Sequence, residues 1–156
     1  MDLHPDFNDL LAEFGRFAVR YALLGGYAVG YYSKPRATRD LDLLVSGDGD
    51  NLNRVGSALA DFGAPAAVVE AARTMGPTEI VYLGQPPLRI DLLRSADGID
   101  TEAVLGRAHH IELSALRIPV LALDDLIENK RAAGRPQDQA DVAALERVRA
   151  RWAPRP

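Results

Sequence analysis

Hydrophobic residues recur along the chain at two spacings, which predict alternating helices and strands. Phe7, Leu10, Leu11 and Phe14 lie three or four positions apart, as on one buried face of a helix. Residues 40–45 alternate between polar and apolar side chains until their last step, which is typical of a strand with one buried face. The pattern predicts helices over residues 6–19, 27–33, 52–62, 64–76, 101–108, 123–133 and 136–152, and strands over 20–24, 40–45, 78–83, 88–93, 110–113 and 117–120.

Glycine and proline residues mark the ends of several of these elements. Pro35 ends the second helix because the residue before a proline avoids helical dihedral angles. Residues 84–87 join two strand-like runs and predict a hairpin. Gly134 ends the sixth helix, and Pro136 opens the last one in the favoured first-turn position. The order predicts an α/β (α+β) fold in which helices cover a small mixed β-sheet.

Length and composition narrow the class of protein. With 156 residues we expect one domain over residues 1–156, with a core at about 20–95 and a C-terminal helical part at about 121–152. The net charge of −4 argues against extended coating of nucleic acid, and the absence of cysteine excludes disulfides and thiol nucleophiles. The acidic N-terminus lacks a signal-peptide core, and the apolar region 17–32 is interrupted by Arg20. We therefore expect a cytoplasmic protein without a membrane partner.

Two carboxylates stand out in the apolar run 40–45. Asp40 and Asp42 share one face of the predicted strand, while Leu41 and Leu43 share the other. Like charges held this close repel each other unless a cation lies between them, and carboxylate oxygens suit Mg²⁺ or Mn²⁺. The alternative is a solvent-exposed strand face. Because aspartate is a poor strand former, two of them inside an apolar run favour a functional role.

Asp91 repeats this arrangement on a later strand. Ile90 and Leu92 would face the core and Asp91 the opposite side. If this strand lies beside residues 40–45, three carboxylates meet on one sheet face. Two-metal phosphoryl or nucleotidyl transfer requires such a set, and the third carboxylate can act as general base.

The pair Gly25–Gly26 lies between a predicted strand and a predicted helix. The pair can simply satisfy positive backbone dihedral angles. It can also let backbone N–H groups at the helix N-terminus approach a triphosphate. Because two aspartates follow the pair, the second interpretation is favoured.

Together these motifs resemble the nucleotidyltransferase superfamily, whose fold is that of DNA polymerase beta. The family pattern is a Gly-Gly or Gly-Ser turn, two acids spaced by one residue and a third acid on a later strand. Here the pattern is carried by Gly25–Gly26, by Asp40 and Asp42, and by Asp91. The Arg-x-Thr-x-Asp-x-Asp form of residues 36–42 is most similar to abortive-infection-type toxins and to minimal nucleotidyltransferases of toxin–antitoxin systems.

The resemblance implies roles for particular residues. It implies metal binding and catalysis by Asp40, Asp42 and Asp91, with Mg²⁺ or Mn²⁺ as cofactor and an NTP such as ATP as substrate. It implies contacts to the nucleotide from Gly25, Gly26, Thr38, Arg39 and Lys130. Arg36 lies in the same approach and can equally belong to a solvated loop.

Lys130 continues an apolar helical stripe with Leu126 and Ile127. It could project into the cleft as a phosphate ligand, or lie along the surface near a helix C-terminus. The segment around it resembles a Lys-to-Arg-x-x-Asp block of the toxin-like members. By position alone, Asp138 is a favourable partner for the dipole of the last helix.

These inferences predict an enzyme that transfers a nucleoside monophosphate from an NTP to a hydroxyl or phosphate acceptor and releases pyrophosphate. The chain has little room for an acceptor-binding domain, so we expect a protein or structured RNA acceptor, with a cognate toxin or antitoxin as a further partner. The alternative is a module on the same fold that binds a nucleotide or a partner without turnover. A phosphohydrolase is less favoured, because no histidine lies near the aspartates in sequence.

Overall fold

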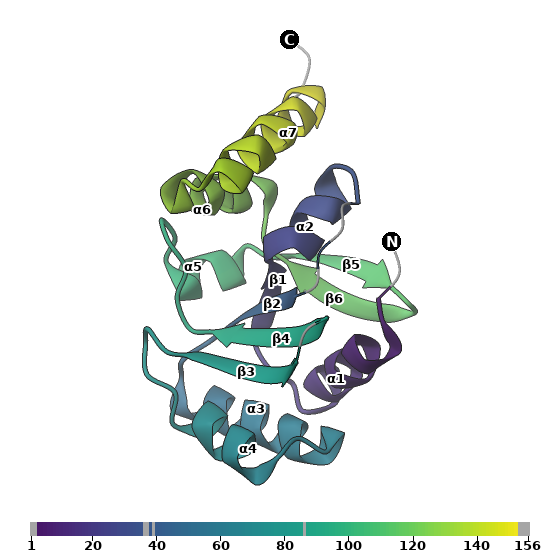
Figure 1. Ribbon diagram of the computed structural model, residues 1–156, viewed down its shortest axis with the longest axis vertical. Coiled ribbons are helices and arrows are strands. Elements are labelled where there is room, and N and C mark those ends of the chain that lie inside the picture. The colour runs from purple at the N-terminus through teal and green to yellow at the C-terminus, as the bar shows by residue number, and fades with distance from the viewer. Residues whose placement is uncertain (1–2, 36–37, 39, 86, 153–156) are drawn as a thin grey trace.

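The centre of the fold is a mixed sheet between helices (Figure 1). The computed structural model describes residues 3–35, 38, 40–85 and 87–152. In these residues six strands pair in the order β3-β4-β2-β1-β6-β5. β2 pairs with β4, and β1 with β6, in parallel, while the other neighbours are antiparallel. The strands are β1 (Tyr21–Leu24), β2 (Asp40–Val45), β3 (Ile80–Gln85), β4 (Leu88–Leu93), β5 (His109–Leu113) and β6 (Leu116–Val120).

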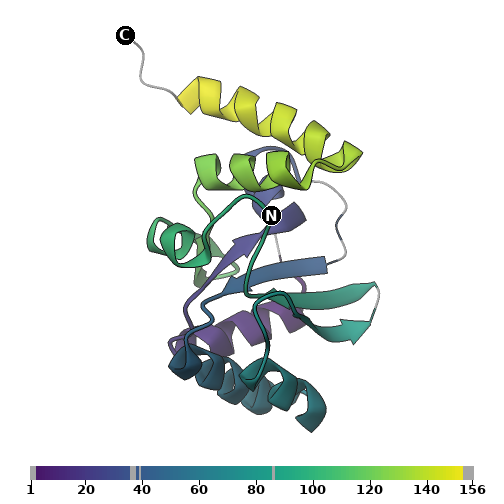
Figure 2. The same cartoon turned by 90° about the vertical axis from the view of Figure 1, so that its left-hand side faces the viewer.

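Helices cover both faces of the sheet (Figure 2). On one side lie α1, α3 and α4, and on the other lie α2, α6 and α7 (Figure 1). No helix in the described part of the chain is long and apolar enough to cross a membrane. The helices are α1 (Pro5–Arg16), α2 (Gly25–Tyr32), α3 (Gly49–Phe62), α4 (Ala66–Arg73), α5 (Thr101–Gly106), α6 (Leu123–Ala133) and α7 (Pro136–Trp152).

The predicted fold class is confirmed, and the main differences lie at the ends of helices. α1 ends at Arg16, three residues before its predicted end, because Ala18 adopts a positive φ of 53° and the chain turns into β1. α2 begins at Gly25, two residues earlier than predicted. α3 begins at Gly49, also earlier than predicted, because the side chain of Asp48 accepts a hydrogen bond from the Asn51 N–H and caps the helix.

Alternation along β2 divides its side chains between the two helical layers. Leu41 and Leu43 are fully buried in the hydrophobic core. Asp40 and Asp42 project from the other face and are half-buried. The core thus holds the strand by its leucines, and the carboxylates face the layer that contains α2, α6 and α7.

A buried asparagine connects β1, β2 and α3. The Asn51 side-chain oxygen accepts from the Arg20 N–H at 2.7 Å. Its Nδ2 donates to the carbonyls of Arg20 at 3.1 Å and Ser46 at 2.9 Å. Asn51 is completely buried, so it satisfies three backbone groups where β1 begins and β2 ends.

We expect Asn51→Ala to lower the free energy of unfolding by roughly 2–4 kcal/mol, because the substitution leaves buried backbone groups without partners. Urea unfolding followed by circular dichroism measures this change. The matched control is Asn53→Ala in the same helix, whose side chain is exposed; its effect should stay within about 0.5 kcal/mol. Equal effects of the two substitutions would contradict this role of Asn51.

An ion cluster joins α6 to α7. Lys130 Nζ lies 3.1 Å from Asp138 Oδ1 and 3.2 Å from Asp141 Oδ2, and all three side chains are less than a tenth exposed. Arg135 Nε donates to Asp138 Oδ2 at 2.7 Å. Burial raises the pKa of Asp138, but its hydrogen bonds to Arg135 and Lys130 outweigh this and lower the pKa to about 2. Asp138 is therefore more than the dipole partner expected from its position.

The cluster predicts a pH-dependent contribution to stability. Because the folded-state pKa of Asp138 lies below the ordinary value of 3.8, its contribution is complete above about pH 4 and is lost as the pH falls towards 2. Asp138→Asn should therefore lower the free energy of unfolding by roughly 2–4 kcal/mol at pH 7. The difference from the unsubstituted protein should shrink as the pH falls below 4.

Urea titrations at a series of pH values from 7 to about 3 measure this difference. Asp124→Asn is the matched control on α6, because Asp124 forms an exposed ion pair with Arg149 and should contribute less than about 1 kcal/mol at any pH. A difference for Asp138→Asn that does not change with pH would contradict the assignment.

Candidate active site

The three predicted carboxylates lie on one face of two neighbouring strands. β2 and β4 pair in parallel, with the Cα of Asp42 opposite that of Asp91 and the Cα of Asp40 opposite that of Arg89. Side chains directly opposite one another on one sheet face lie close together. The condition stated from the sequence is therefore met: the strand of Asp91 lies beside that of Asp40 and Asp42, and the three carboxylates share one sheet face.

The carboxyl group of Asp42 lies in a strongly perturbed electrostatic environment. Burial, followed by the negative charges of Asp91 and Asp40, raises the pKa of Asp42 to about 7. A hydrogen bond with the Asp91 side chain acts in the same direction, while the charge of Lys130 acts against it. The site therefore favours either a proton or a cation beside Asp42.

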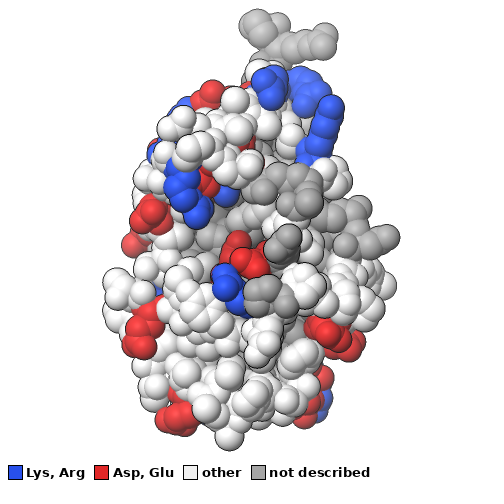
Figure 3. All heavy atoms as spheres, viewed as in Figure 1, with Lys and Arg blue, Asp and Glu red and all other residues white. Residues whose placement is uncertain are grey.

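Arg89 already provides a positive charge on this face. Its Nε and one terminal nitrogen donate to the two oxygens of Asp91 at 2.8 and 3.1 Å. The same terminal nitrogen lies 3.1 Å from Asp40 Oδ2. Arg89 was not identified from the sequence, although its position two residues before Asp91 on a strand places it on the acidic face. Figure 3 shows acidic and basic side chains together at a hollow near the middle of the molecule.

The Gly25–Gly26 turn packs directly against the acidic strand. Gly25 has a φ of +70°, and a Cβ placed on it would lie 2.1 Å from Asp42 Oδ2. A Cβ on Gly26 would lie 2.6 Å from the hydroxyl oxygen of Thr38. The turn therefore needs glycine both for its dihedral angle and for close approach. The backbone at the N-terminus of α2 consequently lies next to the carboxylate of Asp42.

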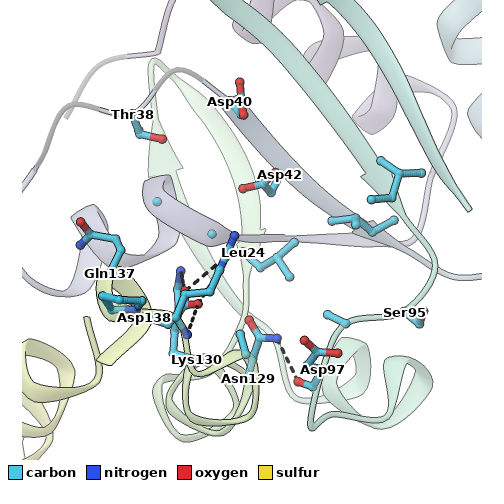
Figure 4. Close-up of a pocket in the computed structure, with 18 residues that line it drawn as sticks. Leu24, Thr38, Asp40, Asp42, Ser95, Asp97, Asn129, Lys130, Gln137 and Asp138 are labelled. Atoms are coloured by element: carbon cyan, nitrogen blue, oxygen red, sulfur yellow. Dashed lines mark hydrogen bonds and ion pairs between the residues drawn. The ribbon is translucent and has the colours of Figure 1, made fainter. Parts of the chain in front are cut away.

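These elements open into a cavity of about 770 Å³. Residues of β2 line one side, and residues of α6 and α7 line the opposite side (Figure 4). The lining includes the predicted site residues Gly25, Gly26, Thr38, Asp40, Asp42 and Lys130. Asp91 is not among the described lining residues; it is buried, and Arg89 donates to both of its oxygens.

Lys130 reaches the cavity as predicted, but its ammonium group is held between Asp138 and Asp141. It thus acts on Asp42 through its charge. Arg135 and Gln137 also line the cavity and were not identified from the sequence, because they are brought there only when α7 folds back onto α6. Asn129 of α6 lines the cavity as well, with its Nδ2 donating to the Asp97 carbonyl at 2.9 Å, and was not identified either. Arg36 and Arg39 lie outside the described residues.

Two of the three carboxylates are placed to bind a divalent cation. Asp40 and Asp42 offer oxygen atoms towards the cavity, as hard cations require. Within the described residues, no group of three or more histidine, aspartate or glutamate side chains is gathered as a metal site. Arg89 forms ion pairs with Asp91 at 2.8 Å and with Asp40 at 3.1 Å on the same face. Asp40 and Asp42 therefore fit a cation, whereas Asp91 is occupied.

Solved structures with the same fold include nucleotidyltransferases. The lincosamide antibiotic adenylyltransferase LnuA, with lincomycin bound, matches with a TM-score of 0.62 and 14% identity over 94% of this chain and 98% of that one. ANT(2″)-Ia in complex with adenylyl-2″-tobramycin matches with a TM-score of 0.56 and 14% identity, over 94% of this chain and 97% of that one. An antigenic nucleotidyltransferase-like protein from Paracoccidioides brasiliensis matches with a TM-score of 0.53 and 12% identity, over 92% of this chain and 74% of that one.

No protein-family model and no curated protein sequence matches the chain. The structural matches have identities of at most 14%, so what they establish is the fold. They agree with the predicted resemblance at that level, while the toxin-like subgroup remains a prediction. The chain has the fold of the nucleotidyltransferases.

Proposed function

We propose that the chain is a metal-dependent nucleotidyltransferase, which moves a nucleoside monophosphate from an NTP to a hydroxyl acceptor and releases pyrophosphate. The observation that carries this proposal is the packing of Gly25 against Asp42 beside the parallel pair of Asp42 and Asp91. A phosphate-binding turn and an acidic strand face thereby meet in one cavity. Such sites work mainly by electrostatics and by in-line positioning of the reacting groups.

Asp40 and Asp42 would hold Mg²⁺ or Mn²⁺. When bound there, the ion would neutralise phosphate charge and lower the pKa of the attacking hydroxyl. The half-buried position of both carboxylates at the cavity wall supports this assignment. Asp91, once released from Arg89, would complete the set or accept the proton of the hydroxyl.

The remaining wall of the cavity would bind the nucleotide. Backbone N–H groups of Gly25 and Gly26 lie at the N-terminus of α2, where an anion is favoured. The Thr38 hydroxyl lies over the same turn. Lys130 adds a buried positive charge, and Arg135 an exposed one, from the opposite side. Arg39, implied by the resemblance, stays a prediction for the same role.

For the acceptor, we propose a small hydroxyl-bearing molecule. LnuA is described as a lincosamide antibiotic adenylyltransferase with lincomycin bound, and ANT(2″)-Ia as a complex with adenylyl-2″-tobramycin. The present chain covers 98% and 97% of these two chains, which supports an acceptor of similar size. The cavity also falls within the usual volume range of small-molecule sites. The sequence predicted a protein or structured RNA acceptor in a toxin–antitoxin setting. The labelling experiment below distinguishes a protein or RNA acceptor from a small molecule.

A nucleotide-binding module without turnover is the second candidate. The observation that favours it is the ion pairing of Asp91 with Arg89, which occupies the proposed base. Binding and transfer are therefore tested separately.

Binding is tested by thermal unfolding with Mg²⁺ and each NTP. We expect a saturating NTP to raise the melting temperature by roughly 5–11 °C, because a ligand at a hundredfold excess over its Kd adds about 2.7 kcal/mol and each kcal/mol shifts a domain of this size by about 2–4 °C. Asp42→Asn should abolish the rise. Asp50→Asn, at an exposed position in α3, should retain it. The absence of a rise with every NTP would contradict a nucleotide site.

Transfer is tested by incubating the protein with an NTP labelled in its α-phosphate, Mg²⁺ and a cell extract. We expect label in a new small-molecule product, distinct from the NTP and from free NMP, because Asp40 and Asp42 would hold the ion that transfer requires and the proposed acceptor is a small molecule. Label in a discrete protein or RNA band would instead identify that acceptor class. Binding without label in any fraction would support the module. Asp40→Ala should remove all transfer, and label that persists in this variant would refute the site.

The Gly25 packing gives a prediction of its own. Gly25→Ala should lower the free energy of unfolding by roughly 1–3 kcal/mol, because the new Cβ meets Asp42 and φ is positive. It should also abolish the NTP-dependent rise in melting temperature. Gly15→Ala is the control, since its Cβ would meet nothing within 4 Å and should be neutral or stabilising. An unchanged NTP response in Gly25→Ala would contradict the close approach.

A further inference from the structure

Arg89 is held on three sides of its guanidinium group. The two nitrogens nearest Asp91 form a fork with its two oxygens, and one of them also bonds Asp40. The guanidinium carbon lies 4.6 Å from the centre of the Tyr82 ring. Tyr82 faces Asp91 across the β3–β4 hairpin. This geometry differs from that of a solvated surface arginine, because a bidentate fork and an aromatic face fix the plane of the group.

The position of Arg89 relates to the charge of the site. Three ionised carboxylates carry three negative charges. One divalent cation leaves a net negative charge on the face, and two divalent cations leave a net positive charge. One divalent cation together with Arg89 balances the three negative charges. The guanidinium lies between Asp91 and Asp40, whereas the Asp40 and Asp42 oxygens at the cavity wall stay accessible to an ion.

We propose that Arg89 is the built-in cation of the acidic face, so that the free protein binds one divalent ion, through Asp40 and Asp42. Arg89 occupies the position between Asp40 and Asp91, which a second ion can enter only when the guanidinium leaves. This inference rests on the proposed function, because it takes Asp40 and Asp42 as cation ligands. Arg89 is a positioning residue in this scheme, since it acts through the two carboxylates that it binds.

The alternative role for Arg89 is structural, namely to stabilise the β3–β4 hairpin. The two roles differ in what they predict for cation binding. Loss of a hairpin contact lowers stability and leaves the number of bound ions unchanged. Loss of a built-in cation exposes Asp91 and raises the affinity for a second ion. A count of bound ions therefore separates the roles.

The experiment is a titration with Mn²⁺ alone, followed by electron paramagnetic resonance and calorimetry on the full chain. The unsubstituted protein should bind one Mn²⁺. Arg89→Gln should bind two Mn²⁺ ions. The second should bind at least about tenfold more tightly than any second ion in the unsubstituted protein, because a nearby positive charge changes the affinity of a carboxylate for a proton by one to three powers of ten and should oppose a metal cation in the same way. Arg89→Lys keeps the charge and loses the fork, and should retain one ion.

Arg117→Gln is the matched control, because it removes an exposed arginine from β6; it should leave the titration unchanged. Circular dichroism and urea unfolding show whether each variant is folded. If Arg89→Gln is not folded, Arg89→Met, which also lacks the charge, takes its place with the same expected count of two ions. Two ions in the unsubstituted protein, or one ion of equal affinity in Arg89→Gln, would overturn the inference and leave the metal site standing. No Mn²⁺ binding by any variant would overturn the metal site as well.

Discussion

Parallel pairing of β2 with β4 forces Asp42 against Asp91, and the rest of the site compensates for that repulsion. Burial and the neighbouring acids raise the pKa of Asp42 to about 7, so the face does not carry its full negative charge without a counter-ion. Arg89 supplies one positive charge within the sheet. Lys130 supplies another from the opposite wall. A bound divalent cation would add further positive charge, and a bound triphosphate would add negative charge.

The opposite wall owes its position to the ion cluster between α6 and α7. Lys130 is buried because Asp138 and Asp141 lie within hydrogen-bonding distance of its ammonium group. A buried charge without such partners would be strongly unfavourable, so the cluster fixes how α7 returns along α6. The same return brings Arg135 and Gln137 to the cavity. The packing of two helices and the electrostatics of the site are therefore coupled.

The sequence predicted the acidic face because alternation along a strand is a local property. Asp40, Asp42 and Asp91 could each be assigned to a face from their immediate neighbours. The register that sets Asp42 opposite Asp91 could not be predicted, since it depends on pairing between strands far apart in the chain. The partners of Lys130 were missed for the same reason, because they depend on the fold-back of α7. Alternation along β4 also places Arg89 on the face of Asp91, whereas its ion pair with Asp40 depends on the pairing of β4 with β2.

The glycine turn and the acidic strand form one structural unit, although α2 and the residues after it separate them in the chain. The space that a Cβ on Gly25 would occupy is taken by the Asp42 carboxylate, so the identity of each residue constrains the other. Their contact also lets the backbone at the start of α2 and the acid face the same cavity. A glycine pair selected only for its dihedral angles would not require this contact. The close approach therefore favours the functional interpretation of the turn over the purely conformational one.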